Sequence, residues 1–187
     1  LNTGFQGDVM VNNIPLEKKN LKTIRKNVGY VFQDADSQLF MSTVFDDVAF
    51  APRNYGMSEA EVNEKTMEAL KVVHIEQLKD KQIYKLSGGE KKLASIATIL
   101  STEPDVILMD EPSVALDPKN RRNLINILNR LNQAKIIASH DLNMIMDTCE
   151  RTILLSDGKI IKDGNTKEIL LDKELMEESG LELPLGY

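Results

Sequence analysis

The clearest hydrophobic pattern in the chain is the apolar run at residues 106–109, which is followed at once by Asp110 and Glu111. A short apolar run that ends at turn signals is typical of a parallel strand buried on both faces. Similar runs predict a strand over residues 28–32 and another buried strand over residues 134–139. Together these runs predict a parallel sheet covered by helices.

Short polar patterns mark where helices begin. Ser58 and Ser87 are each followed three residues later by Glu, which is the capping-box pattern. Asp117 followed by Pro118 predicts another helix start, and Asp141 caps a further helix. The apolar positions expected on the buried faces of the last three helices are Leu93, Ile96, Ala97, Leu100, Leu124, Ile127, Leu128, Leu131, Leu142, Ile145, Met146 and Cys149.

Weaker patterns complete the layout. Residues 7–11 predict a strand that runs into a turn, and residues 21–27 are interpreted as a short basic connection. Residues 45–50 have a helical pattern, with Pro52 as a breaker beyond it. Near the end of the chain, Asp157-Gly158 predicts a hairpin.

Strands therefore alternate with helices at both ends of the chain, and a mostly helical block lies between them. This layout predicts an α/β nucleotide-binding type of fold with an inserted helical subdomain. We expect residues 1–33 and 101–187 to form the α/β core and residues 34–100 to form the helical subdomain.

Composition excludes some functions. The 187 residues are 42% hydrophobic and carry a net charge of −6, which argues against binding nucleic acid through bulk charge. The single cysteine, Cys149, rules out a disulfide within the chain. No apolar run approaches the ~20 residues of a membrane span, so we expect any role at a membrane to depend on a partner.

Asp110 and Glu111 are the first candidates for chemistry. In an open α/β sheet, ligands bind outside the carboxyl ends of the strands. An Asp at such an end can hold Mg²⁺, and a neighbouring Glu can polarise an attacking water. The alternative is that the two acids merely cap the next turn.

Other chemistry-bearing residues recur in a fixed order along the chain. Gln33 ends the strand at residues 28–32, and His140 follows the strand at residues 134–139. The turn between them is Ser87, Gly88, Gly89 and Glu90, and a further loop runs from Pro112 to Pro118. Each feature alone is more simply a strand end, a helix cap or a structural histidine, but the ordered set resembles the ATP-binding subunit of an ABC transporter.

The resemblance covers essentially the whole chain and implies a P-loop NTPase (RecA-like) ABC ATPase core that uses ATP and Mg²⁺. It implies that Asp110 and Gln33 contact Mg²⁺, and that Glu111 and His140 act on the attacking water and the γ-phosphate. It implies that Ser87, Gly88, Gly89 and Glu90 form the signature motif, which contacts nucleotide, and that Asp117 lies in the D-loop. Two glycines at a helix start suit phosphate, because free N–H groups and the positive dipole end meet there.

A finer resemblance is to the cobalt- and vitamin-type energy-coupling-factor ATPases. The stretch from Gly29 to Phe40, residues 44–52 and the tail from Leu181 to Pro184 are typical of them. This resemblance implies a second ATPase subunit, a transmembrane coupling protein and a solute-binding membrane subunit as partners, and no nucleic acid. It places the protein at the cytoplasmic face of the membrane.

One part of the family pattern is absent from the 187 residues, the P-loop G-x-x-x-x-G-K-S/T. We therefore expect the chain to be a fragment truncated at its N-terminus and inactive alone, with the absent strand belonging in the middle of the core sheet. Two other hypotheses remain open. One is a non-enzymatic ABC domain that retains only dimer and docking surfaces, and the other is a non-transport ABC ATPase.

Overall fold

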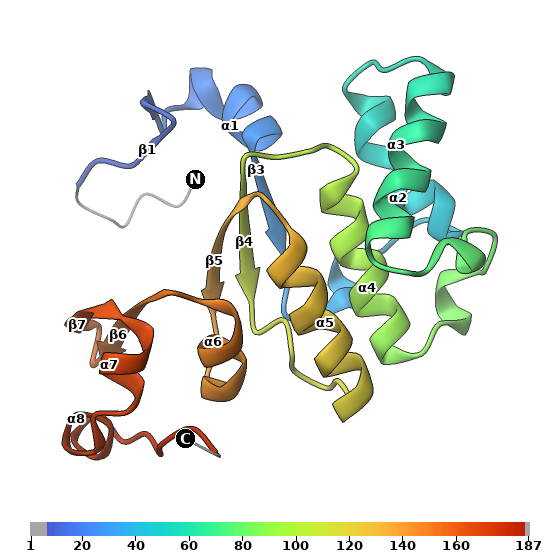
Figure 1. Ribbon diagram of the computed structural model, residues 1–187. Helices are drawn as coiled ribbons and strands as arrows, with labels where there is room; N and C mark the ends of the chain where they lie inside the picture. Colours follow the sequence, from blue (N-terminus) through green and yellow to red (C-terminus); the bar gives the residue numbers. More distant parts are fainter. Residues whose placement is uncertain (1–6, 186–187) are drawn as a thin grey trace.

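The computed structural model describes residues 7–185, and its elements alternate much as the sequence predicts (Figure 1). The strands are β1 (Met10–Val11), β2 (Ile14–Pro15), β3 (Val28–Val31), β4 (Val106–Asp110), β5 (Ala134–Ala138), β6 (Arg151–Ser156) and β7 (Lys159–Asn165). The α-helices are α1 (Leu21–Asn27), α2 (Val44–Asn54), α3 (Glu59–Val72), α4 (Gly88–Leu100), α5 (Pro118–Arg130), α6 (Leu142–Thr148), α7 (Thr166–Leu170) and α8 (Lys173–Glu178). Short 3-10 helices span Lys18–Asn20, Ala35–Ser37, Glu76–Leu78 and Ile83–Lys85.

Strands β3, β4 and β5 form a parallel sheet with β4 in the middle. Ile107 and Met109 are buried in the same core cluster as residues of α4 and α5. On the opposite face, Tyr30 is 42% exposed and Ile136 is 63% exposed. The parallel sheet is confirmed, but the expectation that β4 and β5 are buried on both faces is wrong. In β4 only alternate residues are buried, and β5 is an edge strand with no fully buried residue.

The helical block between β3 and β4 packs as three helices, α2, α3 and α4, on the right of Figure 1. Both capping boxes are confirmed: Ser58 opens α3 with Glu61, and Ser87 opens α4 with Glu90. In α4 the four apolar positions named above are all buried, because they repeat at helical spacing and face the core.

Two interpretations of local structure are wrong. Residues 21–27 form helix α1 rather than a connection, although only Ile24 in it is buried. Pro52 lies inside α2, which ends at Asn54. Proline has no N–H for the carbonyl of Val48, four residues back. The hydroxyl of Ser101 donates to that carbonyl at 2.9 Å, so the helix continues through the proline with its backbone satisfied.

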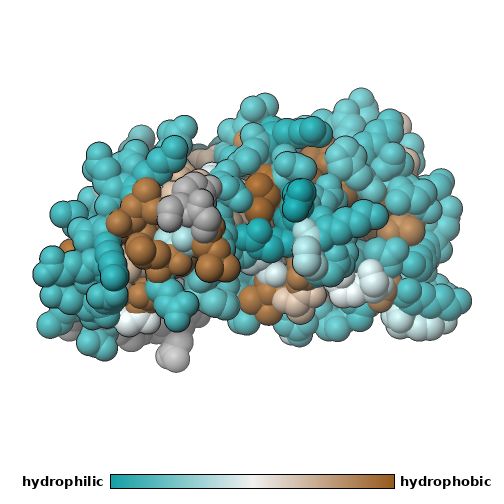
Figure 2. Space-filling model, turned by 60° about the horizontal axis from the view of Figure 1, so that its bottom comes forward, coloured by the Kyte–Doolittle hydropathy of each residue, from teal (hydrophilic) through white to brown (hydrophobic). Residues whose placement is uncertain are grey.

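The C-terminal part of the described chain forms a separate two-stranded sheet, β6–β7, with α7 and α8 beside it. The predicted hairpin turn is confirmed, and Asp157 and Gly158 both have positive φ. Figure 2 shows hydrophobic side chains gathered in its left half, on the side of these C-terminal elements. Among the helices of residues 7–185, none has the length and apolar character that crossing a bilayer requires.

Candidate functional site

The site predicted from Asp110 and Glu111 lies at the carboxyl edge of the parallel sheet. Asp110 is the last residue of β4, and the N–H of Glu111 donates to the carbonyl of Ala138 in β5 at 2.8 Å. Glu111 has a φ of +42°, an uncommon conformation for a residue with a side chain. The backbone therefore turns sharply just where the two acids meet the neighbouring strand.

Glu111 is held by residues that follow β5. Its Oε2 accepts from the hydroxyl of Ser139 at 2.8 Å, and its Oε1 accepts from the backbone N–H of His140 at 2.9 Å. The Nδ1 atom of His140 lies 2.7 Å from the same Oε1. This hydrogen bond and the negative charge of Glu111 raise the pKa of the imidazole above its usual value. The Glu111 side chain is 18% exposed and the His140 side chain 75% exposed, so a largely buried, hydrogen-bonded carboxylate contacts an exposed imidazole.

Asp110 has a different environment from its neighbour. It is half-buried, and the hydroxyl of Tyr30 donates to its Oδ2 at 3.4 Å. Burial raises the pKa of Tyr30, and the charge of Asp110 acts in the same direction. Within residues 7–185, no cluster of three or more His, Cys, Asp or Glu suits a metal ion. The single carboxylate of Asp110 fits Mg²⁺ that arrives with a phosphate, because this ion is usually held by one or two carboxylates together with phosphate oxygens and water.

Gln33 lies just beyond β3 and is exposed. Its side chain makes no hydrogen bond within the part of the chain that the structure describes. Its backbone carbonyl accepts from the ammonium of Lys92 at 2.6 Å. Lys92 lies in α4 and is 3% exposed, so the helical block holds the backbone at Gln33 and leaves the amide free.

The turn formed by Ser87, Gly88, Gly89 and Glu90 closes on itself at the start of α4. The N–H of Ser87 donates to Oε2 of Glu90 at 2.7 Å, and the hydroxyl of Ser87 accepts from the N–H of Glu90 at 3.3 Å. The ammonium of Lys81 also reaches Glu90, at 2.9 Å. These bonds, led by that from Ser87, lower the pKa of the Glu90 carboxyl. Ser87 and Gly88 remain exposed at the positive end of the helix, which suits an anion.

Gly89 is buried against the start of α5. A Cβ at Gly89 would lie 2.6 Å from Nδ2 of Asn120, so only glycine fits without a shift of Asn120. Asp117 caps α5 and accepts from the N–H groups of Lys119 and Asn120, at 2.9 and 3.0 Å. These N–H groups, with that of Asn120 contributing most, hold the pKa of Asp117 below its usual value.

The structure thus brings the predicted residues together in two groups. Asp110, Glu111 and His140 share the carboxyl edge of the sheet, and the turn that begins at Ser87 packs near Asp117. Among the described residues, no hydrogen bond or ion pair connects the two groups.

Three residues near the sheet edge were not predicted to take part in the site: Ser139, Arg121 and Ser113. Arg121 makes two bonds of 2.7 Å to Asp141, the cap of α6. The guanidinium, together with hydrogen bonds that include one from Ser113, lowers the pKa of Asp141 to about 2. The sequence could have indicated a part for Ser139, because it stands directly before His140 in the run Ser139-His140-Asp141. Arg121 had no such signal, because nothing in the spacing links α5 to the start of α6.

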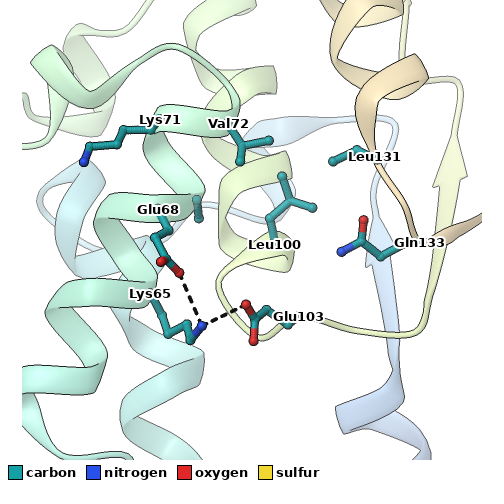
Figure 3. A pocket seen from close by; sticks show the side chains of 9 residues that line it. Lys65, Glu68, Lys71, Val72, Leu100, Glu103, Leu131 and Gln133 are labelled. Carbon is teal, nitrogen blue, oxygen red and sulfur yellow. Dashed lines mark hydrogen bonds and ion pairs between the residues drawn. The ribbon is translucent and has the colours of Figure 1, made fainter.

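A hollow remote from these residues lies between α3, the end of α4 and the loop after α5 (Figure 3). Its rim is tied by Lys65, whose ammonium contacts Glu103 at 2.8 Å and Glu68 at 3.3 Å. Val72, Leu100 and Leu131 provide apolar lining, and Gln133 faces them in the close-up. The ammonium of Lys65 is already paired with two acids, and Lys71 extends away from the apolar lining in the close-up (Figure 3).

A shallow groove of about 410 Å³ lies between residues 36–42 and residues 82–84. Its aromatic side chains are accessible: Phe40 is 64% exposed and Tyr84 is 74% exposed. Phe40 also packs edge-on against Phe50 of α2, with ring centroids 4.8 Å apart. Exposed aromatic residues gathered in this way are typical of a surface for a protein partner.

The parallel sheet, the acid pair at its carboxyl edge and the inserted helical block together form an α/β fold of the nucleotide-binding type. Residues 2–114 match the protein family described as ABC transporter. Protein GSU1281 of Geobacter sulfurreducens, named as an ABC transporter ATP-binding protein, is 47% identical over 97% of this chain and 73% of its own length. The chain belongs to the ABC transporter family, as an ATP-binding domain, and members of this family are ATPases.

Further similarities add detail. The energy-coupling factor transporter ATP-binding protein EcfA of Carboxydothermus hydrogenoformans is 40% identical over 99% of this chain and 69% of its own length. CbiO1 from Clostridium perfringens, described as part of the ABC transporter complex CbiONQ, superimposes with a TM-score of 0.81 and 35% identity, over 90% of this chain and 70% of that one. The cassette MJ0796, described as a dimer bound to ADP and Pi, gives a TM-score of 0.75 at 29% identity, over 86% of this chain and 74% of that one.

Proposed function

We propose that this chain belongs to the ATP-hydrolysing subunit of an importer of the energy-coupling-factor type, which takes up cobalt, another metal ion or a vitamin. The observation that carries the proposal is the contact between Glu111 and His140 at the carboxyl edge of the sheet, beside Asp110. The names of its relatives EcfA and CbiO1 support the transport class. A separate membrane subunit would select the solute.

Each residue of the first group, Asp110, Glu111 and His140, has a proposed role, and so has Gln33. Asp110 would hold Mg²⁺ on ATP, and Gln33, which follows β3, would reach the same ion. When bound, Mg²⁺ would neutralise charge on the β- and γ-phosphates. Glu111 orients or deprotonates the attacking water, and His140 steadies the charge that develops on the γ-phosphate. For this, the accessible imidazole must keep its contact with Glu111 while the carboxylate exposes one oxygen to water.

The second group would act on a different ATP molecule. Ser87, Gly88 and Gly89 present the open end of α4 to the γ-phosphate bound by a second ATPase subunit, and Asp117 lies where the two subunits meet. Glu90 acts through the cap of Ser87, because its carboxylate is occupied by the helix start and by Lys81. The separation of the two groups within one chain supports this head-to-tail arrangement.

Phosphate binding also requires a P-loop, which the 187 residues do not contain. We propose that the P-loop strand pairs with the edge of β5 that faces away from β4, which no strand of the described residues occupies. A polypeptide in which a P-loop segment precedes residues 1–187 is called the P-loop form below. It would carry all the residues that one subunit contributes to the two ATP sites of a dimer. The 187 residues alone would be inactive.

Equilibrium binding of labelled ATP to the two polypeptides tests this assignment. The P-loop form should bind Mg-ATP with micromolar affinity, and the 187 residues alone should bind it far more weakly. Micromolar binding by the 187 residues alone would contradict it. A P-loop form that folds but neither binds nor hydrolyses ATP would favour the second candidate, a non-enzymatic domain that retains dimer and docking surfaces.

The groove with Phe40 and Tyr84 is the proposed docking surface for the transmembrane coupling protein, at the cytoplasmic face of the membrane. Closure of the ATPase dimer would move that partner. Co-purification with membrane subunits tests this: Phe40→Ala should reduce their recovery, whereas Val72→Ala, on the exposed side of α3, should not. Recovery of RNA or DNA instead would point to a non-transport ABC ATPase.

A further inference from the structure

Lys92 is a lysine that lies buried in α4. It is 3% exposed, and within residues 7–185 it forms no ion pair. Lysine is rarely buried unless its charge is compensated. The ammonium instead donates to two backbone carbonyls, that of Phe32 at 3.0 Å and that of Gln33 at 2.6 Å. Burial lowers the pKa of Lys92, while the charges of Asp34 and Asp110 act in the opposite direction.

A second side chain holds the same segment from the other side. Oε1 of Gln38 accepts from the N–H of Phe32 at 3.1 Å. Nε2 of Gln38 donates to the carbonyl of Ser95 at 2.7 Å and to the hydroxyl of Thr98 at 2.8 Å. Both backbone groups of Phe32 are therefore bonded to side chains that are anchored on α4.

The position of Lys92 along α4 gives these bonds their significance. Lys92 lies one helical turn after Gly88 and Gly89. The start of α4 therefore carries the signature turn, residues 87–90, and the next turn of the same helix carries the lysine that holds the Gln33 turn, residues 32–36. A charge-assisted hydrogen bond is stronger and more directional than one between neutral groups. The ammonium can thus hold two carbonyls of a turn that has no regular secondary structure.

We propose that Lys92 is a positioning residue that fixes the Gln33 turn to the signature helix, so that these two parts of the ATP sites move as one body. This inference rests on the proposed roles of Gln33 and Ser87. In a head-to-tail dimer the Gln33 turn serves one ATP and the signature turn of the same chain serves the other. Lys92 then links the two sites within one chain.

Steady-state ATP hydrolysis by the P-loop form tests the proposal. Lys92→Met keeps the length of the side chain and removes the charge and the donors. It should lower kcat about tenfold to a hundredfold, because a displaced positioning group costs rate even when binding persists. KM for Mg-ATP should stay within about threefold, because the P-loop would still bind the phosphates. Lys92→Arg, which keeps charge and donors, should recover most of the rate.

The matched control is Lys71→Met, which removes the same charge from an exposed lysine of α3 and should leave kcat unchanged. Unchanged kcat in Lys92→Met, or an equal loss in Lys92→Arg and Lys92→Met, would overturn the inference. Hydrolysis by Glu111→Gln, measured in the same experiment, separates failure of the proposed catalytic roles from failure of the inference about Lys92. If Glu111→Gln also hydrolyses ATP normally, the proposed catalytic roles fail; if only Lys92→Met does, the roles stand and the inference about Lys92 fails.

A purely structural lysine would lower the folded fraction and leave the rate per folded molecule unchanged. Rates are therefore normalised to folded protein, measured by circular dichroism. Should Lys92→Met not fold, Lys92→Gln provides the same comparison with one neutral donor retained. Amide hydrogen exchange gives an independent readout: residues 32–36 should exchange faster in the variant while residues 58–72 do not, and equal protection at residues 32–36 would contradict the proposal.

Discussion

Replacement of Ser101 by alanine tests how helix α2 tolerates the proline inside it. The Ser101 hydroxyl donates to the carbonyl of Val48, the group that Pro52 leaves without its helical partner. Ser101 is 1% exposed and Val48 is fully buried, so no water replaces the lost donor. A buried carbonyl left without a partner costs about 1–3 kcal/mol. We expect Ser101→Ala to lower the free energy of unfolding by that amount.

The cause can be isolated by repeating the substitution in a Pro52→Ala background. Alanine restores an N–H that can donate to Val48, so the loss from Ser101→Ala should shrink to about 0.5–1 kcal/mol. The difference between the two losses is the coupling energy of a double-mutant cycle, and we expect about 1 kcal/mol or more.

Denaturant unfolding of the four proteins measures these values. Ser95→Ala is the matched control, because Ser95 is equally buried in α4 but donates only to the carbonyl of Lys92 within the same helix. It should change the free energy of unfolding by less than about 0.5 kcal/mol beyond the small packing loss. Equal losses for Ser101→Ala with and without the proline would refute the explanation.

Three further predictions concern the sheet and its carboxyl edge. Gly29→Ala should destabilise the fold by about 1–3 kcal/mol, because a Cβ there would clash with the side chain of Ile99 in α4, whereas Gly164→Ala, whose nearest neighbour would be 3.8 Å away, should not. Arg121→Met should lower the free energy of unfolding by about 1–2 kcal/mol at pH 7 after allowance for solvent screening. The pKa of Asp141 is about 2 and its ordinary value is 3.8, so denaturant titrations should show the whole loss above pH 3.8 and a smaller loss towards pH 2. The raised pKa of His140 predicts an NMR titration midpoint above 6.5. The ion pair of the imidazolium with Glu111 should be fully formed below pH 6.5 and be lost as the pH rises through that midpoint, and a midpoint at or below 6.5 would contradict the contact.

Local signals predicted the elements whose geometry depends on neighbouring residues in the chain. The caps at Ser58, Ser87 and Asp117 need only a side-chain oxygen and a free N–H two or three residues away. The hairpin at Asp157-Gly158 needs two residues that accept positive φ. The strand that ends at Asp110 has an apolar run bounded by turn signals, and the resemblance to the ABC family placed the acid pair in a chemical context.

The features that sequence patterns did not reveal depend on contacts between distant segments. Helix α1 buries only Ile24, so its pattern lacks an apolar face. The proline in α2 is tolerated through Ser101, which lies 53 residues from Val48 along the chain. The exposure of β5 depends on which elements cover it, and its apolar pattern suggests burial. Lys92 lies 60 residues from Phe32, so its contacts with the Gln33 turn leave no signal in either segment.

Glu111 is proposed to act on the water that attacks ATP, and the substitution Glu111→Gln tests this role. The amide keeps the size of the side chain and can still contact Ser139 and His140, but it cannot accept a proton. Single-turnover hydrolysis of ATP by the P-loop form is measured with ATP binding determined in parallel. We expect ATP binding to be retained while turnover falls at least about a hundredfold. Undiminished turnover with retained binding would contradict it.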